Sequence, residues 1–196
     1  MKKSFSLIIL IVTASVIQFL GSGCAYKLSS QSASLPGNVK VIQIPLFKND
    51  SNEVGAETYF TNALKTEAIR SKIVQVKNDE ADVEAVLQGR IRDITVIADE
   101  SVIEAKNTAY LPTENVLATQ YKVTATIILE LKRRNSTEML YSGQFVQTLN
   151  YSAPQITLPV INTANSLYNE SAKRQTLDAI SKELMQAAFD RMVEDF

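Results

Sequence analysis

Three consecutive basic residues, Lys132-Arg133-Arg134, form the cluster in this chain that is best suited to bind an anion. Ammonium and guanidinium groups donate hydrogen bonds to phosphate oxygens, so this cluster could contact the phosphate groups of a lipid or of a partner protein. Lys106 and Lys122, within and just after the polar segment 99–119, could extend such a surface. A solvated charged turn has the same composition, and this alternative stays open.

Acidic residues gather in a second segment, which contains Asp79, Glu80, Asp82 and Glu84. Paired carboxylates can hold a metal ion or perform acid–base chemistry. Here they fall in a turn between two predicted strands, where no other ligand type accompanies them. This setting favours a solvated turn, and we predict no metal site.

The composition gives no positive support for catalysis. The chain contains no histidine, which removes histidine-based triads and the commonest metal ligand. It also lacks a glycine-rich phosphate loop and a Gly-x-Ser-x-Gly motif. A net charge of −1 does not favour binding to nucleic acid. We therefore predict a non-enzymatic protein without catalytic residues or cofactor; a hydrolase that uses serine or carboxylates remains an alternative.

The first 24 residues have the pattern of a bacterial lipoprotein signal. Lys2 and Lys3 precede a mostly apolar stretch at 5–20, and Gly21-Ser22-Gly23 leads directly to Cys24, the only cysteine. This stretch is shorter than a usual transmembrane helix. We predict a signal peptide at 1–23, acyl groups such as palmitate on Cys24 and a tether at 24–38. In the sorting of enteric lipoproteins, which this signal resembles, Asp after the cysteine favours the inner membrane, so Ala25 implies the outer membrane. The body of the protein would then lie in the periplasm or inside a partner.

The rest of the chain predicts one domain at 39–196, which begins with a β-branched strand over 39–44. Apolar residues at helical spacing predict helices over about 56–71 and 169–195. Alternation predicts strands at 73–76 and 83–96, with a bulge near Arg92-Asp93, and a hairpin of strands at 121–132 and 139–150. The segment 99–119 and a last segment that holds Pro154 and Pro159 are predicted loops.

Two one-sided helices require one apolar sheet face to cover. We therefore predict an α+β fold, in which a mixed, mostly antiparallel sheet of about four to five strands carries both helices on one face. The opposite face would be rich in threonine, serine and glutamine. Such a face can be a docking surface, or it can simply be solvated.

Three segments resemble the lipopolysaccharide-assembly lipoproteins of the LptE family. Residues 24–28 read Cys-Ala-Tyr-Lys-Leu and resemble the Cys-Gly-Tyr-x-Leu that begins the mature family members. Residues 35–49 resemble the opening strand with its Pro-Phe-x-Asn-type exit, and residues 81–91 are similar to the Ala-Asp-x-x-Leu-x-Gly-x-Ile strand.

The resemblance implies a protein that plugs the outer-membrane barrel LptD, helps to assemble it, and binds lipopolysaccharide during transport to the cell surface. It implies no residue for lipopolysaccharide, so the four candidates come from charge alone: Lys106, Lys132, Arg133 and Arg134. The alternative is a periplasmic lipoprotein that activates a cell-wall synthase or joins a secretion channel.

Overall fold

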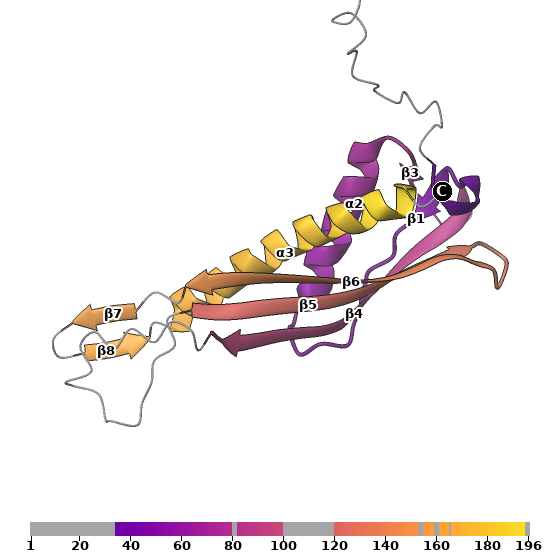
Figure 1. Cartoon of the computed structure of the whole chain (residues 1–196). Helices are drawn as coiled ribbons and strands as arrows, with labels where there is room; N and C mark the ends of the chain where they lie inside the picture. The colour runs from indigo at the N-terminus through magenta and orange to yellow at the C-terminus, as the bar shows by residue number, and fades with distance from the viewer. Residues whose placement is uncertain are drawn as a thin grey trace, which may run out of the picture. The chain divides into compact units, whose positions relative to one another are not determined.

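The computed structural model describes residues 34–79, 82–99, 120–152, 155–158, 161–164 and 166–194 (Figure 1). Strand, helix, strand, long strand, hairpin and helix follow one another as predicted. The elements in chain order are η1 (Pro36–Asn38), β1 (Val41–Gln43), β2 (Lys48–Asn49), α2 (Ala56–Ser71), β3 (Gln75–Val76), β4 (Ala85–Ala98), β5 (Gln120–Arg133), β6 (Met139–Ser152), β7 (Gln155–Leu158), β8 (Ile161–Ala164) and α3 (Ser166–Glu194).

Six strands form one mixed sheet in the order β3-β1-β4-β5-β6, with β2 paired to β4. The long strands β4, β5 and β6 are antiparallel, whereas β1 is parallel to β3 and β4, and β2 is parallel to β4. The α+β class is thus confirmed, and the strand number is slightly higher than predicted. The added strand, β2, is two residues long, too short to show alternation in the sequence.

The strands β7 and β8 pair with each other in a separate two-stranded sheet. They fall in the segment that was predicted to be a loop. Each is four residues long. The signal peptide, residues 24–33 of the predicted tether and most of the 99–119 segment lie outside the described residues. No helix in the described part of the chain is both long and apolar enough to span a membrane.

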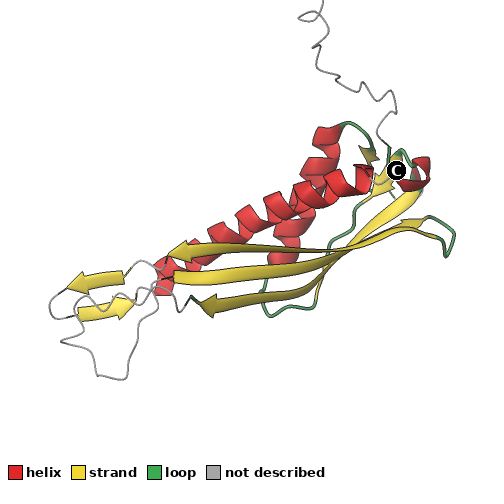
Figure 2. Cartoon of the chain, in the orientation of Figure 1, coloured by secondary structure: helices red, strands yellow, loops and turns green. Residues whose placement is uncertain are grey.

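Both helices cover the same face of the sheet, as predicted (Figure 2). The odd-numbered residues of β5 from Val123 to Leu131 are fully buried beneath them, while the even-numbered residues are partly exposed on the other face. Side chains from both helices complete a single apolar core, in which Phe60, Leu64, Ile180 and Phe189 are among the largest fully buried residues.

The predicted irregularity in the long strand β4 is confirmed. The pairing of β4 with β5 shifts between Ile91 and Asp93. Ile91 and Ile94, three positions apart, are therefore both buried in the core, which strict alternation would not permit. This bulge keeps the apolar residues of both halves of β4 beneath the helices.

An ion-pair cluster joins α3 to the loop that precedes α2. Lys173 Nζ lies 3.0 Å from Glu53 Oε2 and 3.1 Å from Glu170 Oε2. Burial alone would lower the pKa of Lys173, but hydrogen bonds to the two carboxylates outweigh it and raise the pKa. The ammonium group therefore stays charged at neutral pH and ties α3 to the loop before α2.

Candidate functional site

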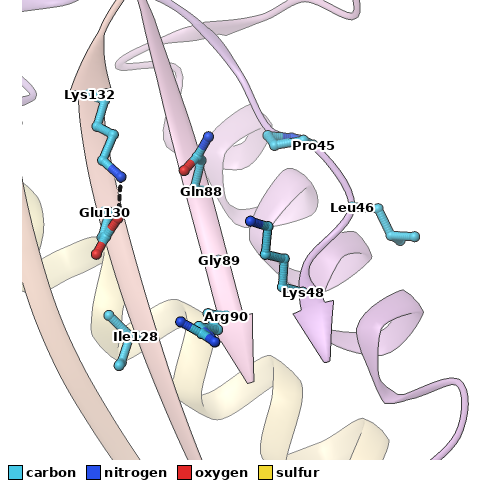
Figure 3. Close-up of a pocket in the computed structure, with 9 residues that line it drawn as sticks. All are labelled: Pro45, Leu46, Lys48, Gln88, Gly89, Arg90, Ile128, Glu130 and Lys132. Atoms are coloured by element: carbon cyan, nitrogen blue, oxygen red, sulfur yellow. Dashed lines mark hydrogen bonds and ion pairs between the residues drawn. The ribbon is translucent and has the colours of Figure 1, made fainter. Parts of the chain in front are cut away.

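A pocket of about 380 Å³ opens on the sheet face opposite the helices (Figure 3). Its walls come from the connection between β1 and β2 and from the neighbouring strands β2, β4 and β5. The lining residues are Pro45, Leu46, Lys48, Gln88, Gly89, Arg90, Ile128, Glu130 and Lys132. The pocket thus combines three cations with one carboxylate and several apolar side chains.

Strand register brings the three cations together. Lys48 on β2 is opposite Arg90 on β4, and Arg90 is opposite Ile128 on β5. Lys132 lies four residues after Ile128 on the same strand and therefore projects from the same face. Figure 3 shows these side chains on three neighbouring strands around one space.

The connection from β1 to β2 is fixed by one buried aromatic residue, Phe47. Its ring packs against Phe60 of α2, with ring centroids 6.3 Å apart, and its backbone N–H donates to Thr61 Oγ1 at 3.0 Å. Because neighbouring side chains in an extended segment point to opposite sides, Leu46 and Lys48 project away from the core, and both are among the lining residues of the pocket. Leu46 is 63% exposed and stands at the pocket's edge.

Two of the three cations already hold carboxylates. Arg90 Nε is ion-paired with Asp50 Oδ2, and Lys132 Nζ lies 2.5 Å from Glu130 Oε2. The hydrogen bond to Asp50 raises the pKa of Arg90, whose guanidinium is charged at neutral pH as in any arginine. Lys48 has no carboxylate partner within the described part of the chain.

The structure separates the residues that the sequence placed in one basic cluster. Lys132 lines the pocket, whereas Arg133 pairs with Glu138 at the end of the hairpin, with Nε 3.2 Å from Oε2. The backbone N–H of Arg134 donates to the carbonyl of Glu84 at 2.9 Å. Cys24 and Lys106 lie outside the described residues, so their roles stay predictions.

Lys48 and Arg90 were not among the predicted site residues. Arg90 could have been predicted as a site residue from its position on the polar face of the long strand. The residues that lie beside Arg90 could not have been predicted, because the pairing of strands brings them there. The acid that Arg90 binds, Asp50, comes from the loop after β2.

The acidic turn has structural partners. Lys77 Nζ lies 3.2 Å from Asp82 Oδ2, and the carboxylate of Glu84 accepts a hydrogen bond of 2.8 Å from the backbone N–H of Lys40. Among the described residues, no three acidic or cysteine side chains come together as ligands of a metal ion would.

A second hollow of about 500 Å³ lies between α2 and α3. Its charged side chains pair within their own helices, Glu67 with Arg70 and Asp178 with Lys182. These pairs leave no surplus charge to attract an ion. The pocket on the open sheet face is therefore the better candidate for an anionic ligand.

Several solved structures have a loosely similar fold. They include a PelC variant dodecamer from Paraburkholderia phytofirmans, with 11% identity, coverage of 82% of this chain and 92% of that chain, and a TM-score of 0.49. A minor lipoprotein from Acinetobacter baumannii has 10% identity, 80% and 92% coverage and a TM-score of 0.45. Rare lipoprotein B from Shewanella oneidensis has 16% identity, 78% and 92% coverage and a TM-score of 0.39. With TM-scores below 0.5, none of these likenesses informs the function.

No curated protein matches the chain. A family model does: the model of LptE, described as lipopolysaccharide-assembly, matches residues 39–196. This match spans the whole predicted domain, including the segments 39–49 and 81–91 on which the sequence resemblance depended. The chain belongs to the LptE family of lipopolysaccharide-assembly proteins.

Proposed function

We propose that this protein is a non-catalytic outer-membrane lipoprotein that plugs and helps to assemble the LptD barrel. In the same role it binds lipopolysaccharide on its way to the cell surface. Membership of the LptE family supports the assignment to lipopolysaccharide assembly. Cys24, at the end of the signal-like segment, would carry the lipid that anchors the protein in the outer membrane.

The observation that carries the binding role is the pocket on the open sheet face. Lys48, Arg90 and Lys132 come together there beside the apolar side chains of Leu46 and Ile128. The lipid part of lipopolysaccharide joins phosphate groups to acyl chains, so it needs cations and apolar surface side by side. Arginine and lysine bind phosphate through charge-assisted hydrogen bonds, which are stronger than neutral ones.

Charge reversal in the pocket tests this assignment. We expect Arg90→Glu and Lys132→Glu each to weaken the binding of purified lipopolysaccharide by about tenfold, since each removes a charge-assisted contact and adds repulsion. Arg174→Glu is the matched control: it makes the same charge change on α3, where Arg174 pairs with Glu170. Equal losses in all three variants would show that only net charge matters and would contradict the pocket.

The remaining predicted contacts can be ranked in the same titration. Arg133 pairs with Glu138 at the end of the hairpin and is not among the residues that line the pocket, so Arg133→Glu should reduce binding less than Lys132→Glu. Arg134→Glu and Lys106→Glu complete the set of predicted positions. A loss at Arg133 larger than at Lys132 would place the phosphate contact at the hairpin end instead of in the pocket.

The partner is tested by isolating the tagged full-length chain from gently solubilised membranes. We expect a single large β-barrel of the LptD kind to co-purify in nearly equal amount. Recovery with a cell-wall synthase or a secretion channel instead would contradict the plug assignment and favour the alternative function. Mass spectrometry of the co-purified proteins decides between these outcomes.

A further inference from the structure

Carboxylates of the protein itself already occupy cations of the pocket. Arg90 and Lys132, two of its three cations, are each paired with a carboxylate, from Asp50 and Glu130 respectively. Glu130 is itself part of the pocket wall. Three cations against two carboxylates leave one net positive charge at a site that is proposed to bind phosphate.

These two ion pairs contribute little to stability. The exposed fractions of Arg90 and Asp50 are 58% and 42%, and those of Lys132 and Glu130 are 38% and 33%. Ion pairs at such exposure are screened by water and stabilise proteins only weakly. The backbone already fixes the segment that carries Asp50, since its N–H donates to the carbonyl of Ile91 at 3.0 Å. We therefore explain the two ion pairs by their influence on binding in the pocket and not by a contribution to the stability of the fold.

We propose that Asp50 and Glu130 are internal competitors that occupy the cations of the pocket and weaken its hold on a lipid phosphate. This inference rests on the proposed function. Asp50 engages Arg90 at Nε, which together with one Nη forms one of the paired hydrogen-bond arrangements that arginine offers to a phosphate. Glu130 accepts a hydrogen bond from Lys132 and presents its own negative charge to an incoming anion.

The competition would make release of the lipid easier. A protein that passes a lipid onward must release it, and a carboxylate that returns to its cation as the phosphate leaves lowers the cost of release. The ligand is a lipid phosphate rather than a free one, because the exposed side chain of Leu46 and the side chain of Ile128 border the same space. A small inorganic anion would gain nothing from these apolar side chains.

The test measures binding of the full-length protein to vesicles that contain lipid A, for the wild type and for neutral variants of the two carboxylates. Asp50→Asn and Glu130→Gln keep the size of the side chain and remove its charge. We expect each to tighten binding about threefold and the double variant about tenfold, with the gain shrinking at high salt. Glu170→Gln is the matched control, because it removes a carboxylate from an ion-pair cluster outside the pocket.

A third arm separates failure of the inference from failure of the proposed function. Arg90→Gln should weaken binding. If it does so while Asp50→Asn and Glu130→Gln leave binding unchanged or weaker, the competition is refuted and the phosphate site survives. If Arg90→Gln has no effect, the site itself is refuted. Displacement of the vesicles by low concentrations of inorganic phosphate would reassign the pocket to a free anion and overturn the lipid assignment.

Discussion

Replacing Gly89 with alanine is expected to lower the free energy of unfolding by about 3 kcal/mol, because the new methyl group would overlap a buried ring. A Cβ at position 89 would lie 2.2 Å from Cζ and 2.3 Å from Cε1 and Cε2 of Phe47. Both partners are held: Gly89 by pairing with Leu129 across the strands, and Phe47 by a fully buried neighbour, Phe60. Urea-induced unfolding measures the difference.

This expected loss of stability is opposite to the intrinsic preference of a strand for alanine over glycine. Alanine is ordinarily better than glycine inside a strand by roughly 0.5–1 kcal/mol. Glycine at position 89 is thus explained by the close approach of Phe47 and not by a special backbone conformation. A neutral or stabilising Gly89→Ala would show that the ring of Phe47 does not pack over this residue.

A second glycine in the sheet provides the matched control. A Cβ on Gly143 would meet Tyr141 Oη at 2.7 Å and Phe145 Cε2 at 2.9 Å, which are longer distances than those at Gly89, and Tyr141 is only partly buried. We therefore expect Gly143→Ala to cost less than Gly89→Ala. A double-mutant cycle with Phe47→Ala adds a direct check, since removal of the ring should make alanine at position 89 tolerable.

The long elements of the fold could be predicted because their signals are local. The alternation from Val123 to Leu131 indicates a strand with one buried face, and the spacing of Phe60 and Leu64 indicates a helix with one buried face. Two helices with one apolar face each require a sheet to cover. The phase change near Asp93 likewise revealed the bulge. In each case the pattern lies within one continuous segment of the chain.

The pocket could not be predicted, because it depends on contacts between distant segments. Lys48 meets Arg90 only through a two-residue parallel pairing, which leaves no periodic pattern in the sequence. Sequence reasoning grouped Lys132 with Arg133 because they are adjacent in the chain. Adjacent residues of a strand point to opposite faces, however, so a cluster of consecutive charges is divided by the sheet, and charges on neighbouring strands take its place.

Thr61 connects the core to the pocket through two hydrogen bonds. Its hydroxyl accepts from the backbone N–H of Phe47 at 3.0 Å and donates to the carbonyl of Glu57 at 2.6 Å. The residue is 3% exposed, so water does not compete for these groups. The bond joins α2 to the connection that carries Leu46 and Lys48, two residues of the pocket.

Thr61→Val keeps the shape of the side chain and removes both bonds, which leaves the N–H of Phe47 buried without an acceptor. We expect a loss of about 2 kcal/mol in the free energy of unfolding and faster hydrogen exchange at the amide of Phe47.

Thr66→Val is the control on the same helix, since the exposed hydroxyl of Thr66 donates to the carbonyl of Asn62, and it should change stability by less than about 0.5 kcal/mol. Unchanged exchange at Phe47 would mean that its N–H has found another acceptor. If the connection loosens as expected, lipopolysaccharide binding should weaken under conditions in which the domain is still folded, because Lys48 would no longer be held opposite Arg90.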